Sequence, residues 1–314
     1  MRIGASIWPF RWDKPYDDAI RHIAQMGFQA IELIAWDSDA LDTYYTPEVI
    51  KNLKDIIASE GLLLSEFVST PPGMASPDKK ERDASVEHFK RMVDVAVGLG
   101  TQIVNTVSVF PFAIEVPRIT DRPHMQEYSV YYPTGLNWQQ NWEDYVDTVR
   151  RCCDFCEAAK VRYAMEPHPY RYMSNAASML RLIEHVKSDA LGMNFDPSHL
   201  FPMGDMPHTV IYQLGDRIFH CHFSDNDGLT NVHWRPGKGK IDWTSVMRAL
   251  KETGFDGTIS IELEDVPGVA RGQAQVSGVY KGNWDATDAF EEENRKAMAY
   301  IKDIARQLAM PLAG

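Results

Sequence analysis

Four residues of the kinds that bind metal ions each stand at or near the end of a short apolar segment. They are Glu166 in YAMEPHP, Asp196 in MNFDPSH, His222 in RIFHCHFSDND and Glu262 in SIELED. Three carboxylates and one imidazole suit a divalent cation such as Mn²⁺, Mg²⁺ or Co²⁺. Without a cation, carboxylates crowded together would repel and raise one another's pKa. The four residues therefore indicate a metal centre, provided that the fold brings them together.

Each of these residues also has a simpler interpretation when it is taken alone. A carboxylate at a strand end often caps a helix or faces solvent, and Asp196 before Pro-Ser could cap a turn. A histidine in a strand is often a hydrogen-bonded core residue. The recurrence in four successive segments favours the metal centre. His220 shares a face with His222 one layer deeper and could orient the ligands. Asp225 and Asp227 could support His222 or cap the next segment.

Short apolar segments alternate with amphipathic helical patterns along the chain. The predicted strands cover residues 2–8, 30–36, 62–68, 102–108, 161–167, 191–197, 218–224 and 258–264. The predicted helices cover residues 17–27, 47–61, 84–100, 141–160, 174–186, 244–254 and 291–309. Eight strands, each followed by a helix or a helix-sized gap, predict an α/β protein that forms a single (β/α)8 TIM-barrel domain over residues 1–314. A doubly wound open sheet is the alternative, but the segment after the first strand lacks its usual glycine fingerprint.

In such a barrel, chemistry takes place at the carboxyl ends of the strands. All four candidate ligands fall there, on four consecutive predicted strands. At the same mouth we also expect Trp8 and Phe10 from the first strand, Trp36 from the second and Glu66 from the third. Apolar walls around a polar centre are common in sugar sites, so Trp8 and Trp36 are candidate substrate contacts. Plain packing is an equal alternative for each aromatic residue.

Composition limits the partners of this protein. The 314 residues carry a net charge of −12, and an acidic surface repels nucleic acid phosphates and anionic membranes. No run of apolar residues is long enough to span a bilayer, and the N-terminus does not resemble a signal peptide. We therefore expect a cytoplasmic protein without nucleic acid or membrane partners. The four cysteines suit a reducing compartment, where thiols on a buried helical face are the simplest interpretation.

Two connecting segments are long enough to serve as binding loops. Residues 109–139 contain His124 and several aromatic residues that could stack on a sugar or a flat aglycone. An ordered cover or a subunit contact is the alternative for this segment. Residues 266–287 contain Arg271, which could bind phosphate or another part of the substrate, although no compact glycine-rich phosphate cradle is evident.

The sequence resembles the xylose-isomerase-like TIM barrels, a superfamily that includes sugar phosphate isomerases and epimerases, ketose 3-epimerases, inosose dehydratase and endonuclease IV. The resemblance covers essentially the whole chain. It rests on the order and spacing of AMEPHP, NFDPSH, HCHFSD, PGKGKIDW and GTISIELE. It implies that Glu166, Asp196, His222 and Glu262 are metal ligands, with Mn²⁺ the first choice and Mg²⁺ or Co²⁺ as alternatives. It also implies that His199 contacts the substrate and that Glu166 and Glu262 form the acid/base pair.

The residues by themselves do not choose between that glutamate pair and His199 or His168 as the groups that move protons. A metal-bound hydroxyketone can lose a proton next to its carbonyl and form an enediolate. Return of the proton then gives an epimer or an isomer. These considerations predict a metal-dependent sugar isomerase or epimerase. The resemblance also implies a homo-oligomer.

The same intermediate can instead expel a substituent, which would make the protein a lyase. The catalytic subunits of bacterial C-glycoside deglycosidases, which cleave 3-keto-C-glycosides beside a small β-protein subunit, are similar in length and barrel type. In that alternative His124 would act as a catalytic residue on the aglycone. Two further classes are less consistent with the sequence. An endonuclease IV-type enzyme needs more histidine and aspartate ligands, and a non-catalytic sugar-binding protein needs no opposed carboxylates.

Overall fold

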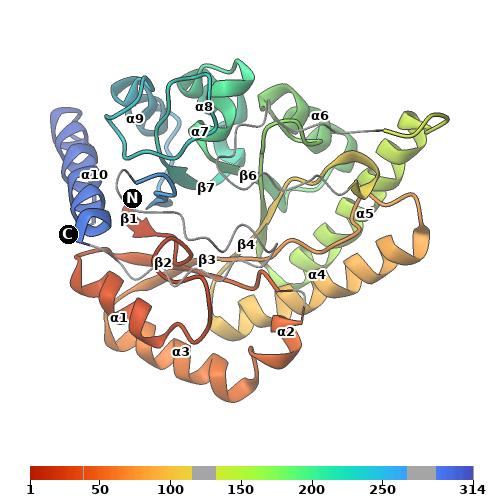
Figure 1. Cartoon of the computed structure of the whole chain (residues 1–314), viewed down its shortest axis with the longest axis horizontal. Coiled ribbons are helices and arrows are strands. Elements are labelled where there is room, and N and C mark those ends of the chain that lie inside the picture. Colours follow the sequence, from red (N-terminus) through yellow and green to blue (C-terminus); the bar gives the residue numbers. More distant parts are fainter. Residues whose placement is uncertain (38, 115–131, 267–287, 314) are drawn as a thin grey trace.

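Eight parallel strands form a closed barrel in a computed structural model that describes residues 1–37, 39–114, 132–266 and 288–313 (Figure 1). The strands follow one another in chain order, and the first pairs with the last. This arrangement confirms the predicted (β/α)8 barrel. The strands are β1 (Arg2–Ala5), β2 (Ala30–Ile34), β3 (Leu63–Val68), β4 (Ile103–Val107), β5 (Arg162–Glu166), β6 (Leu191–Phe195), β7 (Ile218–Phe223) and β8 (Thr258–Ile261).

Helices surround the barrel and separate its strands along the chain. The longer ones are α1 (Asp17–Gln25), α3 (Pro47–Ser59), α4 (Lys79–Leu99), α5 (Trp138–Ala159), α6 (Ala176–Val186), α8 (Pro207–Leu214), α9 (Trp243–Glu252) and α10 (Asp288–Gln307). The short ones are α2 (Ala40–Thr43), α7 (Pro197–Leu200) and the 3₁₀ turns η1 (Pro111–Ala113), η3 (Phe201–Met203) and η4 (Gly215–Arg217). The helix-sized gap between the sixth and seventh predicted strands thus contains α7, η3 and α8. Within the described residues, no helix combines the length and the apolar character needed to cross a bilayer.

Side-chain caps explain why two helices begin earlier than their apolar periodicity predicts. The Asp78 carboxylate accepts a hydrogen bond from the Lys80 backbone N–H at 2.8 Å, so α4 begins at Lys79 instead of residue 84. The Asn137 side chain accepts from the Gln140 backbone N–H at 3.1 Å, so α5 begins at Trp138. These polar caps precede the first buried residue of each helix. Apolar periodicity cannot indicate a helix in that stretch of the sequence.

All the predicted strands except the third were too long at their carboxyl ends, because the chain turns there to form the mouth of the barrel. After β1, the Ile7 carbonyl accepts hydrogen bonds from the backbone N–H groups of Phe10 and Arg11 at 2.9 and 2.8 Å. After β6, the Asp196 carboxylate accepts from the Ser198 N–H at 2.7 Å and caps α7. Strand pairing thus ends just before the residues that line the mouth.

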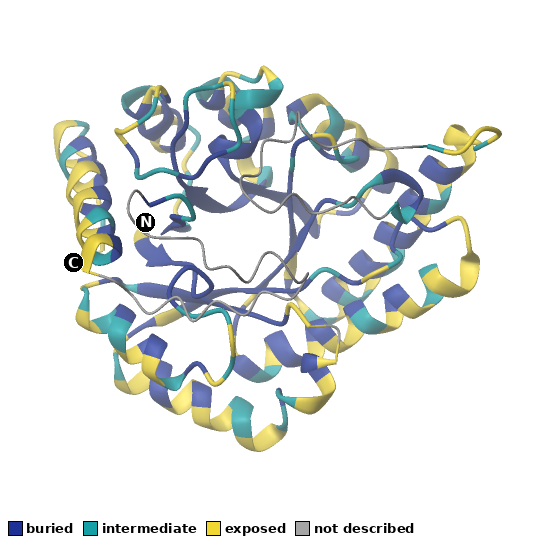
Figure 2. Ribbon diagram, in the orientation of Figure 1, coloured by how far each residue is buried: buried dark blue, intermediate teal, exposed yellow. Residues whose placement is uncertain are grey.

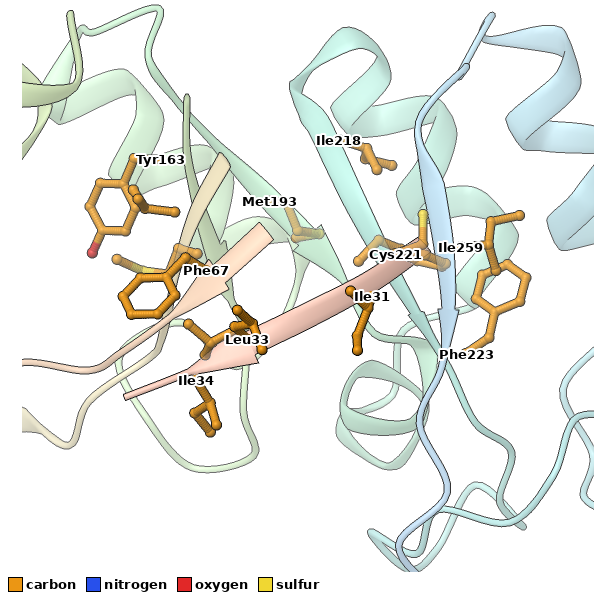
Figure 3. Packing of buried hydrophobic residues seen from close by; sticks show 14 of the residues in the cluster. Ile31, Leu33, Ile34, Phe67, Tyr163, Met193, Ile218, Cys221, Phe223 and Ile259 are labelled. Atoms are coloured by element: carbon orange, nitrogen blue, oxygen red, sulfur yellow. The ribbon is translucent and has the colours of Figure 1, made fainter. Parts of the chain in front are cut away.

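The outer face of the barrel packs against the helices and forms the hydrophobic core, while the exposed residues lie mainly on the outer sides of the helices (Figure 2). Figure 3 shows Cys221 and Phe223 of β7 beside Ile259 of β8 in this cluster. The Phe223 ring lies 4.6 Å from the Trp243 ring of α9, and the Phe89 ring of α4 lies 4.7 Å from that of Tyr163 on β5. Because side chains alternate along a strand, His222, which lies between Cys221 and Phe223, points into the barrel.

The three clustered cysteines of α5 belong to this core. Cys152, Cys153 and Cys156 are buried and have free thiols. Burial raises the pKa of each thiol, to about 12 for Cys153, so these thiols are protonated at neutral pH.

The PGKGKIDW segment is held in place by Asp225, which follows β7. The Asp225 carboxylate accepts hydrogen bonds from the backbone N–H groups of Gly237 and Gly239 at 2.9 Å and from that of Ile241 at 3.1 Å. It also accepts from the Trp243 indole N–H at 2.9 Å. A Cβ atom on Gly239 would lie only 2.2 Å from the Asn226 carbonyl oxygen, so the close approach of the loop requires glycine. Asp225 therefore caps the segment that follows β7.

We expect Asp225→Asn to destabilise the protein by roughly 2–3 kcal/mol, because the amide replaces one acceptor oxygen with a donor that faces N–H groups. Chemical denaturation followed by circular dichroism measures this change. Asp55→Asn is the control, since Asp55 forms only an exposed pair with Lys51 and should change stability by less than about 0.5 kcal/mol. Equal stability of the two variants would contradict this account of the turn.

Candidate active site

Four consecutive strands place the four predicted metal ligands at one point of the barrel mouth. Glu166 is the last residue of β5, Asp196 directly follows β6, His222 lies on β7 and Glu262 directly follows β8. Each offers one ligand atom, and these four atoms all lie within 4.8 Å of one another. All four side chains are buried. The barrel thus gathers residues that are 96 positions apart in the sequence, from 166 to 262.

His222 is the centre of the polar contacts in this group. Its Nδ1 atom lies 3.0 Å from Oε1 of Glu166 and 3.2 Å from Oε2 of Glu262. The Trp8 indole N–H donates a hydrogen bond of 2.7 Å to the other oxygen of Glu262. Two buried carboxylate oxygens, Oδ2 of Asp196 and Oε2 of Glu262, have no hydrogen-bond partner. Such unpaired oxygens in a set of three carboxylates and one imidazole fit a divalent cation.

Burial and mutual charge shift the pKa values of this group in different directions. Burial, reinforced by the charges of Glu262 and Glu166, raises the pKa of Asp196 to about 8. Burial also favours the neutral form of Glu262, but the charge of the nearby His222 outweighs this effect and lowers the pKa of Glu262 to about 2. Burial opposes the charged form of His222, yet the surrounding glutamates raise its pKa well above the usual value. The metal-free site therefore depends on the His222 imidazolium for positive charge.

A second layer of titratable residues lies deeper in the barrel, on the other side of the His222 ring. Nε2 of His222 lies 3.0 Å from Oε2 of Glu32 on β2 and 3.3 Å from Oε1 of Glu66 on β3. His220 lies between the outer oxygens of the same two glutamates, with distances of 3.5 and 3.6 Å. Burial and the charge of Glu32 raise the pKa of Glu66 to about 8. His220 thus occupies the deeper layer that the sequence predicted.

Sequence reasoning did not single out Glu32. The available signal was a charged residue in the middle of the apolar strand segment AIELI, since an unpaired buried charge is costly. Glu66 was expected at the mouth but lies in this deeper layer, fully buried.

Three further histidines lie beside the four-residue group. The His199 ring lies 3.6 Å from that of His168 and 4.7 Å from that of His233. Nε2 of His199 lies 3.5 Å from Oδ2 of Asp196 and 3.7 Å from Oε1 of Glu166. Burial lowers the pKa of His168 and His199 well below the usual value. Neutral imidazoles of this kind can donate and accept hydrogen bonds from a polar substrate.

The other predicted site residues have different positions. Trp8 contacts Glu262 directly, and its ring lies 5.6 Å from that of His222. Trp36 is 42% exposed and lies against Trp12, with 5.5 Å between the rings, so it is available to a ligand at the rim. The expectation that Phe10 faces the mouth was wrong: it is buried, and its ring lies 4.9 Å from that of Phe290 on α10. His124 and Arg271 lie outside the described residues.

The closed barrel with buried carboxylates and imidazoles at its mouth is typical of TIM-barrel enzymes. The model of the Xylose isomerase-like TIM barrel family matches residues 20–279. The chain belongs to this family.

Relatives and solved structures agree with this assignment. Fructoselysine 3-epimerase of Shigella flexneri is 20% identical over 256 residues, which cover 79% of this chain and 85% of that protein. The D-psicose 3-epimerase of Clostridium cellulolyticum H10, whose structure contains D-tagatose, has a TM-score of 0.74 at 18% identity, with 97% of this chain and 99% of that chain covered. The 3-keto-D-glucoside 4-epimerase of E. coli has a TM-score of 0.70 at 17% identity, with 96% and 99% covered. The two structures share the fold with this chain.

The raised pKa of Asp196 gives a prediction for the metal-free protein. The pKa is 3.8 for an ordinary Asp and about 8 here, so the folded state binds an extra proton between these values. Ionising Asp196 therefore costs stability as the pH rises from about 4 to about 8. Asp196→Asn keeps the oxygen that caps α7 and removes this cost. With EDTA present, we expect a melting temperature on the order of 5 °C higher than wild type at pH 8.5.

The gain of Asp196→Asn should shrink toward pH 5, where Asp196 of the wild-type protein is largely protonated in the folded state. Thermal unfolding at both pH values measures the difference. A metal-free variant that is less stable than wild type at pH 8.5 would contradict the assigned charge crowding.

Proposed function

We propose that the protein is a divalent-metal-dependent sugar isomerase or epimerase. The observation that carries the proposal is the meeting of Glu166, Asp196, His222 and Glu262 within 4.8 Å at the barrel mouth. The name of the fructoselysine 3-epimerase, a sequence relative, and that of the D-psicose 3-epimerase, which shares the fold, support a sugar substrate. Mn²⁺ is the first choice of cation, with Mg²⁺ and Co²⁺ as alternatives.

Glu166, Asp196, His222 and Glu262 would hold the cation. When bound, it polarises the substrate carbonyl and stabilises the negative charge that develops on the sugar oxygens. Glu166 and Glu262 are the proposed acid/base pair: one carboxylate removes the proton next to the carbonyl, and the other returns a proton to the resulting enediolate. The Trp8 indole orients Glu262 through its hydrogen bond of 2.7 Å.

His199 and His168 are the proposed substrate contacts beside the carboxylates. Nδ1 of His199 is hydrogen-bonded to Oδ1 of Asn231 at 2.8 Å, which fixes the ring and leaves Nε2 directed toward Asp196 and Glu166. His168 is partly exposed at the same place. Neutral imidazoles at these positions would bind sugar hydroxyls without adding positive charge. Trp8 and Trp36 would supply apolar contacts, and the roles of His124 and Arg271 stay predictions.

The lyase that cleaves 3-keto-C-glycosides is the second candidate. Its first step is the same removal of a proton next to a carbonyl. The structural neighbour that acts on a 3-keto-D-glucoside favours this substrate class as an alternative to free ketoses. Analysis of the products distinguishes the two, since a lyase releases an aglycone and an epimerase keeps every carbon. The homo-oligomer, the small β-protein subunit and the cytoplasmic location stay predictions.

We expect the protein to exchange deuterium from D₂O into the carbon next to the carbonyl of a substrate ketose. A panel of D-fructose, D-psicose, D-tagatose and L-ribulose, followed by NMR, tests this. Glu262→Gln should slow the exchange by roughly 10²- to 10⁴-fold, because the amide cannot accept the proton. Glu252→Gln, the same change on the surface of α9, is the control and should leave exchange unchanged. Full exchange by Glu262→Gln would contradict the assigned role.

Removal of the cation should abolish exchange and lower stability. A cation that binds only the folded protein stabilises it by about 2.7 kcal/mol at a concentration 100 times its Kd. We therefore expect EDTA to lower the melting temperature by roughly 5–10 °C and Mn²⁺ to restore it. Differential scanning calorimetry with and without Mn²⁺ measures this. A purified protein without divalent metal that keeps its activity in EDTA would refute the proposed function.

A further inference from the structure

Glu32 and Glu66 form a pair of carboxylates directly beneath the four-residue group. Both are fully buried, on the adjacent strands β2 and β3, whose register pairs Glu32 with Glu66. One oxygen of each faces the same atom, Nε2 of His222, at 3.0 and 3.3 Å. The opposite nitrogen of the ring, Nδ1, faces Glu166 and Glu262 at 3.0 and 3.2 Å. His222 therefore bridges the two layers of carboxylates.

The two buried carboxylates are themselves fixed in place. The Ser6 hydroxyl donates a hydrogen bond of 3.1 Å to Oε2 of Glu32, and the Asn105 amide donates one of 3.0 Å to Oε1 of Glu66. Their other oxygens lie 3.5 and 3.6 Å from the two nitrogens of His220. Each carboxylate thus contacts both histidines of β7, and neither can turn away from Nε2 of His222 without losing these contacts.

The position of the N–H on the His222 ring decides which ring nitrogen can bind a cation. A neutral imidazole carries one N–H and one lone pair, and a cation can bind only to the lone pair. Carboxylates accept hydrogen bonds, so Glu32 and Glu66 stabilise an N–H on Nε2. The lone pair then lies on Nδ1, on the side of Glu166 and Glu262. The Asn194 amide lies 3.2 and 3.1 Å from the two ring nitrogens and does not favour either.

We propose that Glu32 and Glu66 are positioning residues that accept the Nε2–H of His222, so that its Nδ1 lone pair is presented to the cation bound with Glu166, Asp196 and Glu262. This inference rests on the proposed function, because it assumes that a cation binds there. Glu32 lies closer to Nε2 than Glu66 does and contributes more.

The residues of the deeper layer could instead form a second cation site. Glu32, Glu66, His220 and His222 also offer ligand atoms within 4.8 Å of one another. Both groups contain His222, however, and a neutral ring has a single lone pair for one cation. The deeper group is also completely buried. The positioning role needs only the hydrogen bonds that are present.

Glu32→Gln and Glu66→Gln test the proposal with little change in volume. The new amide can donate toward Nε2 of His222, which favours the other tautomer and withholds the lone pair from the cation. We expect Zn²⁺ affinity, measured by competition with a chelator, to fall roughly 10- to 100-fold, with the larger loss in Glu32→Gln. Ser65→Ala is the matched control, since Ser65 lies in the same layer and contacts His220 at 3.2 Å instead of His222. Its affinity should stay within about threefold of wild type.

A tautomer measurement separates positioning from a general loss of stability. Long-range ¹H–¹⁵N spectra of Zn²⁺-loaded protein with ¹⁵N-labelled histidine should show a protonated Nε2 and a zinc-bound Nδ1 for His222, assigned by the signal missing in His222→Gln. Zinc on Nε2, two zinc ions per chain, or unchanged affinity in both glutamine variants would each overturn the inference. The last result would leave the proposed function standing, whereas a wild-type protein that binds no divalent cation would remove both.

Discussion

The imidazole of His222 lies between four buried carboxylates, and the architecture of the site depends on that arrangement. Glu166 and Glu262 lie within 3.2 Å of one nitrogen, and Glu32 and Glu66 lie within 3.3 Å of the other. Buried carboxylates at such distances cannot all be ionised without positive charge nearby. In the metal-free protein that charge comes from His222, whose pKa is raised accordingly. A divalent cation on the upper side would take over part of this role.

The barrel can maintain this crowding because the four candidate ligands lie on strands or directly after them. Parallel strands bring their carboxyl ends to one mouth, and a closed barrel leaves no edge along which the ligands could separate. The contacts around the mouth add further restraint, since Trp8, which follows β1, donates a hydrogen bond to Glu262 after β8, and Asp225 holds the loop that follows β7. A site whose carboxylates are already held together would not have to be reorganised to bind the proposed cation and sugar.

Proton removal next to a carbonyl is the chemistry that such a site shares with several reactions. In the proposed reaction, the carboxylates at the mouth would determine where the proton leaves, and the groups that contact the rest of the substrate would determine the fate of the intermediate. In this chain the neutral rings of His168 and His199 border the carboxylates on one side, and the exposed Trp36 lies at the rim. Imidazoles can bind the hydroxyls of a sugar, and an exposed indole can pack against its hydrophobic face.

The amino-acid sequence by itself determined the alternation of strands and helices, and thereby the barrel. It also identified the residues that meet at the mouth. These residues, Glu166, Asp196, His222 and Glu262, could be named because each lies near, at or directly after the end of a strand, and the carboxyl ends of parallel strands coincide in space. The PGKGKIDW segment was visible as a pattern, although its dependence on Asp225 was not.

Only the tertiary structure decided which strand residues face one another across the barrel interior. The period-2 pattern shows which face of the sheet a side chain lies on, but not its height in the barrel relative to residues of other strands. That height depends on the register of strand pairing and on bulges such as those of β2 with β3 and of β6 with β7. Glu66 consequently lies beneath the mouth instead of in it, beside Glu32 and His220. Phe10 turned into the core because the chain bends after β1, which its apolar character alone did not reveal.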